Sequence, residues 1–344
     1  MSALTTLALT TSITTSMLIT ASANHWLTAW IGLELNTISI LPIIMKQKNL
    51  RSAEAAMKYL LTQAIASAIM LLSSSLNAWQ TGLWDITQLT NELSCTMMTL
   101  AITIKIGAAP AHFWLPEVMQ GTTIPVALLM ATLQKIPPLT LLYMMANHTK
   151  PNITLTLGML SILAGGWGGI NQTQLRKMMA YSSITHLGWT MTAISISPNI
   201  AMLNIIIYMT ISTPVLLLLS ATSTKTLQAT TNTWSISPTA AFLMTLMLLS
   251  LAGLPPLAGF TPKLAILNIL VTYKLTPMAM IIALSSLLSL LFYLRTTYIL
   301  TSATPPITTQ STTLWRAKTN HNQLTTILAP MALFNMTMMP ALIS

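Results

Sequence analysis

Three lysines lie deep inside runs of apolar residues rather than near the ends of those runs: Lys105, Lys135 and Lys263. Glycine and proline residues, which interrupt helices, stand close to each of them, and Pro137 and Pro138 are expected to break the run just after Lys135. If the runs cross a membrane, an amine at mid-depth costs roughly 2.5–3.5 kcal/mol on insertion scales, so such residues are rare and usually functional. The pattern predicts amines that face a polar interior and exchange protons there. The structural alternative is that they snorkel to the surface or only pair helices.

Glu34 is the acid best placed to act with these lysines, because it lies in the middle of the apolar run at 25–45. A charged Glu34 beside Lys105 would hold the amine protonated, and separation of the pair would let the proton leave. The alternative is an ion pair that serves packing alone. His112 and His186 could each bridge two lysines, because imidazole titrates near neutrality. Each could equally be a hydrogen-bonded packing residue.

Mutual repulsion would couple the lysines into a relay. Two ammonium groups ~10 Å apart repel by about 1.7 kcal/mol at an effective dielectric of ~20. A proton that arrives at one lysine would therefore favour release from the next.

The amino-acid composition indicates the kind of protein in which these lysines and Glu34 lie. The chain has 344 residues, of which 53% are hydrophobic and 6% charged, whereas a soluble domain carries about 25% charged residues. It is therefore expected to be an all-α polytopic membrane protein in contact with lipid. The net charge of +10 comes from thinly spread bases, which does not favour nucleic-acid binding. A single cysteine, Cys95, excludes a disulfide framework and an all-cysteine iron–sulfur site within the chain.

Eleven apolar runs are long enough to cross a membrane. They lie at about 2–20, 25–45, 54–77, 94–120, 124–146, 153–170, 174–196, 200–221, 238–272, 277–300 and 323–342. The fourth and ninth, at about 94–120 and 238–272, are too long for one helix and are interrupted by glycine and proline. Corresponding breaks five spans apart predict two inverted five-helix repeats, at about 1–146 and 153–300, within one membrane domain spanning 1–344. The helix at about 323–342 would be additional.

The loops differ in charge between the two sides of the expected membrane. With the N-terminus on the first side, that side holds Lys46, Lys48, Arg51, Arg176, Lys177, Lys225, Arg316 and Lys318. The second side holds Lys150 and Lys274 together with Asp85 and Glu92. Eight bases against two place the first side in the cytoplasm or matrix. An odd number of spans would put the C-terminus on the opposite side. The first twenty residues contain no arginine or lysine, so a mitochondrial location would require synthesis inside the organelle.

Four sequence blocks resemble one family: IGLELN (31–36), KIGAAPAHFWLPEVMQGTTIPVALLMATLQK (105–135), QTQLRKMMAYSSITHLGW (172–189) and LSLAGLPPLAGFTPK (249–263). They are similar to motifs of the antiporter-like, proton-pumping membrane subunits of respiratory complex I, and the chain looks shorter than most members by three helices. The resemblance assigns the gating glutamate to Glu34 and the relay lysines to Lys105, Lys135 and Lys263. It also matches His112 and His186 to positions in the HFW and SSITHLG parts of these blocks.

The family resemblance implies proton translocation in the mitochondrial inner membrane, beside other membrane-arm subunits, including antiporter-like neighbours. The redox chemistry would belong to partner subunits, which would carry NAD, FMN, iron–sulfur clusters and ubiquinone; no cofactor is expected in this chain. Two alternatives stay open. One is a subunit of a multi-component sodium/proton antiporter, and the other is a structural membrane-arm anchor with vestigial lysines.

Overall fold

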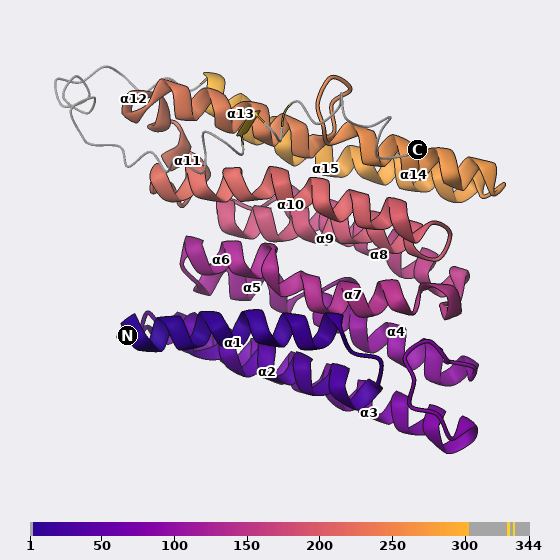
Figure 1. The fold of residues 1–344 in the computed structure, drawn as a ribbon. Coiled ribbons are helices and arrows are strands. Elements are labelled where there is room, and N and C mark those ends of the chain that lie inside the picture. The colour runs from indigo at the N-terminus through magenta and orange to yellow at the C-terminus, as the bar shows by residue number, and fades with distance from the viewer. Residues whose placement is uncertain (1–2, 303–328, 331–332, 334–344) are drawn as a thin grey trace.

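A computed structural model describes residues 3–302, 329, 330 and 333. All regular secondary structure in this part of the chain is helical. The helices lie side by side along one direction, and the chain progresses from α1–α4 at one side of the bundle to α13–α15 at the other (Figure 1). The expected run at 323–342 falls almost wholly outside the described residues.

The first half of the chain begins with three long helices, α1 (Ala3–Ala21), α2 (Trp26–Ile44) and α3 (Leu50–Thr81). Four shorter helices follow: α4 (Glu92–Ile106), α5 (Trp114–Gly121), α6 (Ile124–Ala131) and α7 (Ile136–Met144). A 3-10 turn, η1 (Leu133–Lys135), joins α6 to α7.

The second half continues with α8 (Pro151–Ile170), α9 (Leu175–Ile194) and α10 (Pro198–Ala221). Two single-turn helices, α11 (Leu227–Thr230) and α12 (Thr233–Ile236), lead to α13 (Pro238–Ala252), α14 (Phe260–Thr272) and α15 (Thr276–Ser302). Seven segments of the described chain are long and apolar enough to cross a membrane. The expectation of an all-helical polytopic membrane protein is therefore confirmed in its general form.

Two interruptions fall in the long apolar runs, and both begin at a glycine. Gly107 ends α4 with φ of 86°, and Gly253 ends α13 with φ of 83°. Only glycine adopts this left-handed conformation without a steric penalty, and it is the usual residue after the last turn of a helix. Each break leaves helix-terminal carbonyl groups inside the bundle, where they need polar partners.

A third interruption lies at η1, and it differs from the expectation that Pro137 and Pro138 break the run just after Lys135. The turn ends at Lys135, and the two prolines occupy the first turn of α7. Proline is tolerated there because its missing N–H would have no partner within the helix. The prolines therefore begin a helix, and the break precedes them.

Serine and threonine are frequent in these apolar helices because their hydroxyl groups bond within the helix. The Thr103 hydroxyl donates to the Leu100 carbonyl at 2.7 Å, and the Ser182 hydroxyl donates to Met179 at 2.7 Å. The buried apolar side chains form two clusters, one centred on α5, α6, α10 and α13 and the other on α4, α7 and α9.

Candidate functional site

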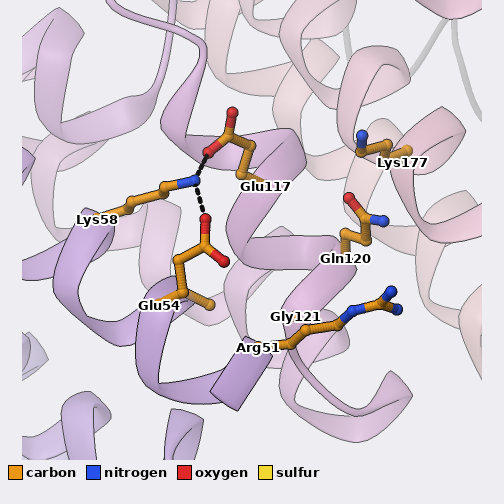
Figure 2. Close-up of a pocket in the computed structure, with 8 residues that line it drawn as sticks. Arg51, Glu54, Lys58, Glu117, Gln120, Gly121 and Lys177 are labelled. Atoms are coloured by element: carbon orange, nitrogen blue, oxygen red, sulfur yellow. Dashed lines mark hydrogen bonds and ion pairs between the residues drawn. The ribbon is translucent and has the colours of Figure 1, made fainter.

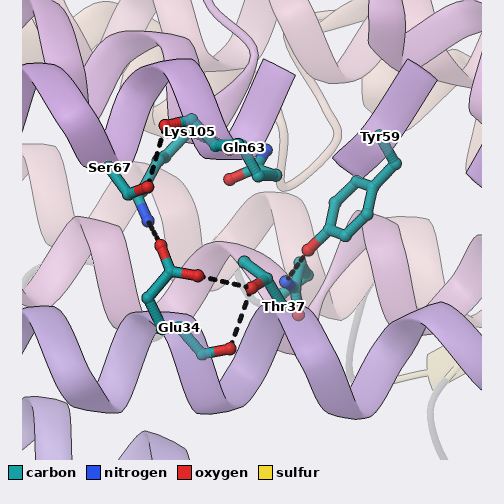
Figure 3. Close-up of polar contacts among 8 residues, drawn as sticks. Glu34, Thr37, Tyr59, Gln63, Ser67 and Lys105 are labelled. Carbon is teal, nitrogen blue, oxygen red and sulfur yellow. Dashed lines mark hydrogen bonds and ion pairs between the residues drawn. The ribbon is translucent and has the colours of Figure 1, made fainter. Parts of the chain in front are cut away.

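Lys105 and Glu34 meet in the interior of the first half. Lys105 lies in the last turn of α4 with 2% of its side chain exposed, and its Nζ is 3.9 Å from Glu34 Oε1 on α2 (Figure 3). Glu34 keeps 27% of its side chain exposed, and its other carboxylate oxygen accepts a hydrogen bond from Thr37 at 3.3 Å. A separation of 3.9 Å gives electrostatic attraction without a hydrogen bond. The Lys105 amine makes no hydrogen bond with any described residue, so a small displacement of Glu34 would separate the pair.

A small polar cavity adjoins this pair. Its lining includes Asn36, Gln63, Lys105 and Gln134, and its volume is about 10 Å³. That is close to the smallest space that holds one water molecule. The Gln134 amide donates to the Tyr59 hydroxyl at 2.6 Å, which fixes one wall of the cavity.

Lys135 faces a second cavity of similar size, lined in part by His186, Thr190 and Tyr208. Its Nζ lies 4.9 Å from the centre of the Tyr208 ring, a distance at which a cation is attracted to the ring face. The amine makes no hydrogen bond within the described part of the chain. Gln134 and Lys135 are consecutive in η1, so this one turn reaches both cavities.

Lys263 lies in the first turn of α14, just beyond the second break. Its Nζ donates a hydrogen bond of 2.8 Å to the carbonyl of Ala252, the last residue of α13, and lies 5.9 Å from the Trp189 ring. The lysine therefore joins the two parts of the interrupted helix. Helix C-termini carry partial negative charge, which favours a cation at this position.

His186 on α9 lies near Lys135 of the first half and Lys263 of the second half. The ring interacts electrostatically with both Lys135 and Lys263. It also packs against Tyr208 with ring centres 4.7 Å apart. The described structure thus places Lys135, His186 and Lys263 in one buried group beside the Glu34–Lys105 pair.

His112 is placed differently. It lies in the loop between α4 and α5, where its Nδ1 is 3.2 Å from the Pro110 carbonyl oxygen and its ring packs on Phe113. None of its hydrogen bonds or ring contacts among the described residues involves a lysine. A role in bridging lysines stays a prediction for this histidine.

Sequence reasoning missed Gln134, Tyr208 and Trp189, which complete the surroundings of the lysines. Gln134 carried a signal, because it is an uncharged polar residue within an apolar run, next to a lysine. The two aromatic residues carried none, because an aromatic side chain in a membrane helix is usually a packing residue.

Lys58 contrasts with the three buried lysines. Its Nζ lies 2.5 Å from both Glu54 Oε1 and Glu117 Oε2, at the rim of a cavity of about 270 Å³ that Arg51 and Lys177 also line (Figure 2). All three partners of this cluster are 40–62% exposed. Lys58 thus has two carboxylate partners in a solvated position. Within the part of the chain that is described, no group of three or more His, Cys, Asp and Glu residues could hold a metal ion.

Buried lysines beside interrupted helices, in a bundle of apolar helices, define an antiporter-like membrane protein. The chain belongs to the family described as NADH:quinone oxidoreductase/Mrp antiporter, transmembrane region, whose profile matches residues 23–289. The resemblance inferred from the four sequence blocks is thereby confirmed.

Relatives are similar over almost the whole chain. NADH-ubiquinone oxidoreductase chain 2 of Varanus timorensis is 49% identical over 97% of this chain and 96% of its own length. The protein of the same name from Xenopus laevis is 46% identical, with 94% and 93% covered.

Solved structures share the fold. A chain of respiratory complex I from Thermus thermophilus with bound aureothin matches with a TM-score of 0.83 at 24% identity, over 97% of this chain and 79% of that one. A chain of the Mrp complex from Dietzia sp. DQ12-45-1b matches with a TM-score of 0.77 at 17% identity, over 84% and 59%.

Proposed function

We propose that this chain is a proton-translocating subunit of the membrane arm of respiratory complex I in the mitochondrial inner membrane. The relatives named NADH-ubiquinone oxidoreductase chain 2 support this assignment over nearly the full length. As such a subunit it is part of an NADH:ubiquinone reductase and contacts other membrane-arm subunits. Partner subunits would bind NAD, FMN, iron–sulfur clusters and ubiquinone and perform the electron transfer.

The observation that carries the proposal is the long Glu34–Lys105 pair next to the buried Lys135–His186–Lys263 group. When Glu34 moves away, the Lys105 ammonium loses its counter-charge and releases its proton toward Lys135. The charge that reaches Lys135 then repels charge on Lys263, which passes a proton onward. His186 is the proposed connection between the last two amines. For His112 we propose a supporting position beside the first break.

Translocation needs energy from outside the chain. Moving one charge against ~150–200 mV costs roughly 3.5–4.6 kcal/mol. The proposal therefore couples Glu34 to conformational change in the neighbouring subunits, driven by their redox reaction.

The membrane topology belongs to the same proposal. The junctions α2–α3, α8–α9 and α10–α11 lie at one end of the bundle (Figure 1). Their loops and first helical turns carry Lys46, Lys48, Arg51, Arg176, Lys177 and Lys225. The positive-inside rule would make this end the matrix side, with the N-terminus there. Helices α1–α7 and α8–α15 would form two inverted five-span repeats, and an eleventh span would put the C-terminus in the intermembrane space.

The proposal is tested by Lys105→Met in the assembled complex, with Lys150→Met as the matched control. Lys150 is a surface residue 2.5 Å from Glu92 and lies outside the buried group. We expect normal assembly, loss of NADH-driven proton uptake into sealed vesicles and a parallel loss of quinone-linked NADH oxidation. The control should keep both activities. Wild-type oxidation and wild-type protons per electron in Lys105→Met would contradict the relay and favour a structural membrane-arm anchor.

The antiporter alternative has a separate readout. Sodium binding would require oxygen ligands at mid-depth. Glu34 is the carboxylate that the described structure places near the buried lysines. Sodium flux through the reconstituted complex that depends on Glu34 would favour a sodium/proton antiporter subunit over the proton relay.

A further inference from the structure

Two cavities adjoin at the end of the bundle that carries most of the loop bases. The first, of about 610 Å³, lies between α1, the end of α2 and α6, and its walls are mainly apolar. The second, of about 350 Å³, lies between the start of α6, the start of α9 and the end of α10. Gln47, Thr123 and Pro125 line both cavities, so the two lie next to each other, and we call them together the cleft.

Three basic side chains line the cleft, one in the larger cavity and two in the smaller. Lys46 comes from the loop after α2, Arg176 from the first turn of α9 and Lys225 from the loop after α10. Backbone hydrogen bonds hold the last two segments together, since Leu175 N donates to Lys225 O at 3.2 Å and Leu227 N donates to Thr173 O at 3.0 Å. The Arg176 guanidinium also donates to the Thr122 carbonyl beside the cleft. The fold therefore brings Arg176 and Lys225 together, and Lys46 lines the adjoining cavity.

The charge of this cleft differs from that of the neighbouring cavity around Lys58. There, Glu54 and Glu117 offset the lysine. Among the described residues that line the cleft there are three bases and no acid. An anion is the complement of this rim, and lysine and arginine are the residues that bind phosphate groups.

The apolar part of the cleft restricts the kind of anion. Leu9, Ile43, Val126 and Leu129 line the larger cavity, and a soluble anion would leave these surfaces without a partner. An occupant that joins a phosphate to a hydrocarbon chain satisfies both parts. Basic pockets at the ends of membrane helices bind anionic lipid headgroups in this way.

We propose that this cleft is a binding site for one anionic diacyl phospholipid. Its phosphodiester lies among Lys46, Arg176 and Lys225, and one acyl chain follows the groove between α1 and α6. The lipid would fill the space between the first helices and α6 and hold the loops at this end together. The site is independent of the proposed proton relay, because it shares no residue with the buried lysine group.

The test measures lipid retention by the purified, assembled complex. Detergent-washed complex is incubated with deuterated phosphatidylglycerol or deuterated phosphatidylcholine, washed again, and the retained lipid is counted by mass spectrometry. The variant is Lys46→Gln with Lys225→Gln, which leaves the Arg176 contact with Thr122 intact. The matched control is Lys48→Gln with Lys177→Gln, which removes the same charge from two bases at the same end that do not line the cleft.

We expect the cleft variant to retain phosphatidylglycerol roughly tenfold or more weakly than the control, since each basic residue near an anionic headgroup contributes about a factor of five. Phosphatidylcholine retention should be equal in both. Leu129→Trp, which fills the apolar part without changing charge, should also lower phosphatidylglycerol retention. Equal retention of phosphatidylglycerol in the cleft variant and the control would overturn the proposal.

Two further outcomes identify another occupant and would also overturn it. If 100 mM inorganic phosphate displaces the signal and Leu129→Trp has no effect, the site binds a free anion and no acyl chain. If a photocrosslinker at Leu129 joins a partner subunit rather than lipid in the wild-type complex, the groove is a protein interface.

Discussion

The two interrupted helices of this molecule each place a buried lysine beside the break, but the two lysines have different partners. Both end at a left-handed glycine, Gly107 in the first half and Gly253 in the second, and both carry a buried lysine beside the break. In the first half Lys105 precedes the break and has a carboxylate, Glu34, at 3.9 Å. In the second half Lys263 follows the break, and its partner is the Ala252 carbonyl at 2.8 Å.

The Glu34–Lys105 contact joins two different helices and can open when they move apart. The Lys263–Ala252 contact lies within one interrupted helix. A carboxylate on a neighbouring helix moves with that helix, so the attraction on Lys105 depends on the position of α2. A carbonyl at the end of α13 moves only if the interrupted helix itself rearranges. The comparison favours the Glu34 side for the proposed gate, because Lys263 has a fixed acceptor in its own broken helix.

The largest expected effect is on the Lys263 side. Lys263→Met removes the amine and leaves the Ala252 carbonyl unsatisfied, which costs about 1–3 kcal/mol of stability. Proton-coupled turnover should fall by about 100-fold or more, the usual contribution of a positioned proton donor. Lys263→Arg should preserve assembly, because the guanidinium still donates to Ala252, but should not restore turnover, because arginine does not release its proton.

Proton uptake and NADH oxidation in sealed vesicles, together with thermal stability of the complex, measure both variants. Lys274→Met, at an exposed position on the opposite end of the bundle from most loop bases, is the control. Full activity in Lys263→Arg would assign this lysine a purely structural role as the cap of α13 and would remove it from the relay.

A smaller effect is expected on the Glu34 side. Glu34→Gln keeps the size of the side chain and its contact with Thr37 but removes the charge facing Lys105. The pair at about 4 Å interacts by roughly 4 kcal/mol at an effective dielectric of about 20, of which desolvation cancels a part. We expect coupled turnover to fall about tenfold with normal assembly. Glu92→Gln, which removes an exposed carboxylate, is the matched control, and equal activities of the two variants would contradict the gate.

Much of this comparison was predictable from the sequence, for a physical reason. Lysine is costly in an apolar run, and glycine and proline interrupt helices, so their coincidence marks the two breaks and the lysines beside them. The pairing of Glu34 with Lys105 followed from charge, since a buried acid needs a basic partner and few are available. These features depend on local residue types and on their depth in a span.

Other features depend on packing between distant segments and were not predictable. Two prolines after Lys135 indicated a break, but proline is compatible with either the end of one helix or the first turn of the next. The aromatic partners of Lys135 and Lys263 come from α10 and α9, and no local pattern specifies which rings face a given amine. The Ala252 acceptor was hidden for a similar reason, because any residue supplies a backbone carbonyl.

The smallest expected effect concerns Tyr208, which contacts both Lys135 and His186. If the ring face holds the lysine, Tyr208→Phe should change turnover less than about threefold, because the cation–π attraction survives loss of the hydroxyl. Tyr208→Leu removes the ring and should reduce turnover roughly tenfold, since such contacts contribute about 2 kcal/mol when desolvated. Vesicle proton uptake compares the two. A loss in Tyr208→Phe as large as that in Tyr208→Leu would assign the role to the hydroxyl, and Lys135 would then resemble Lys263, whose acceptor is an oxygen.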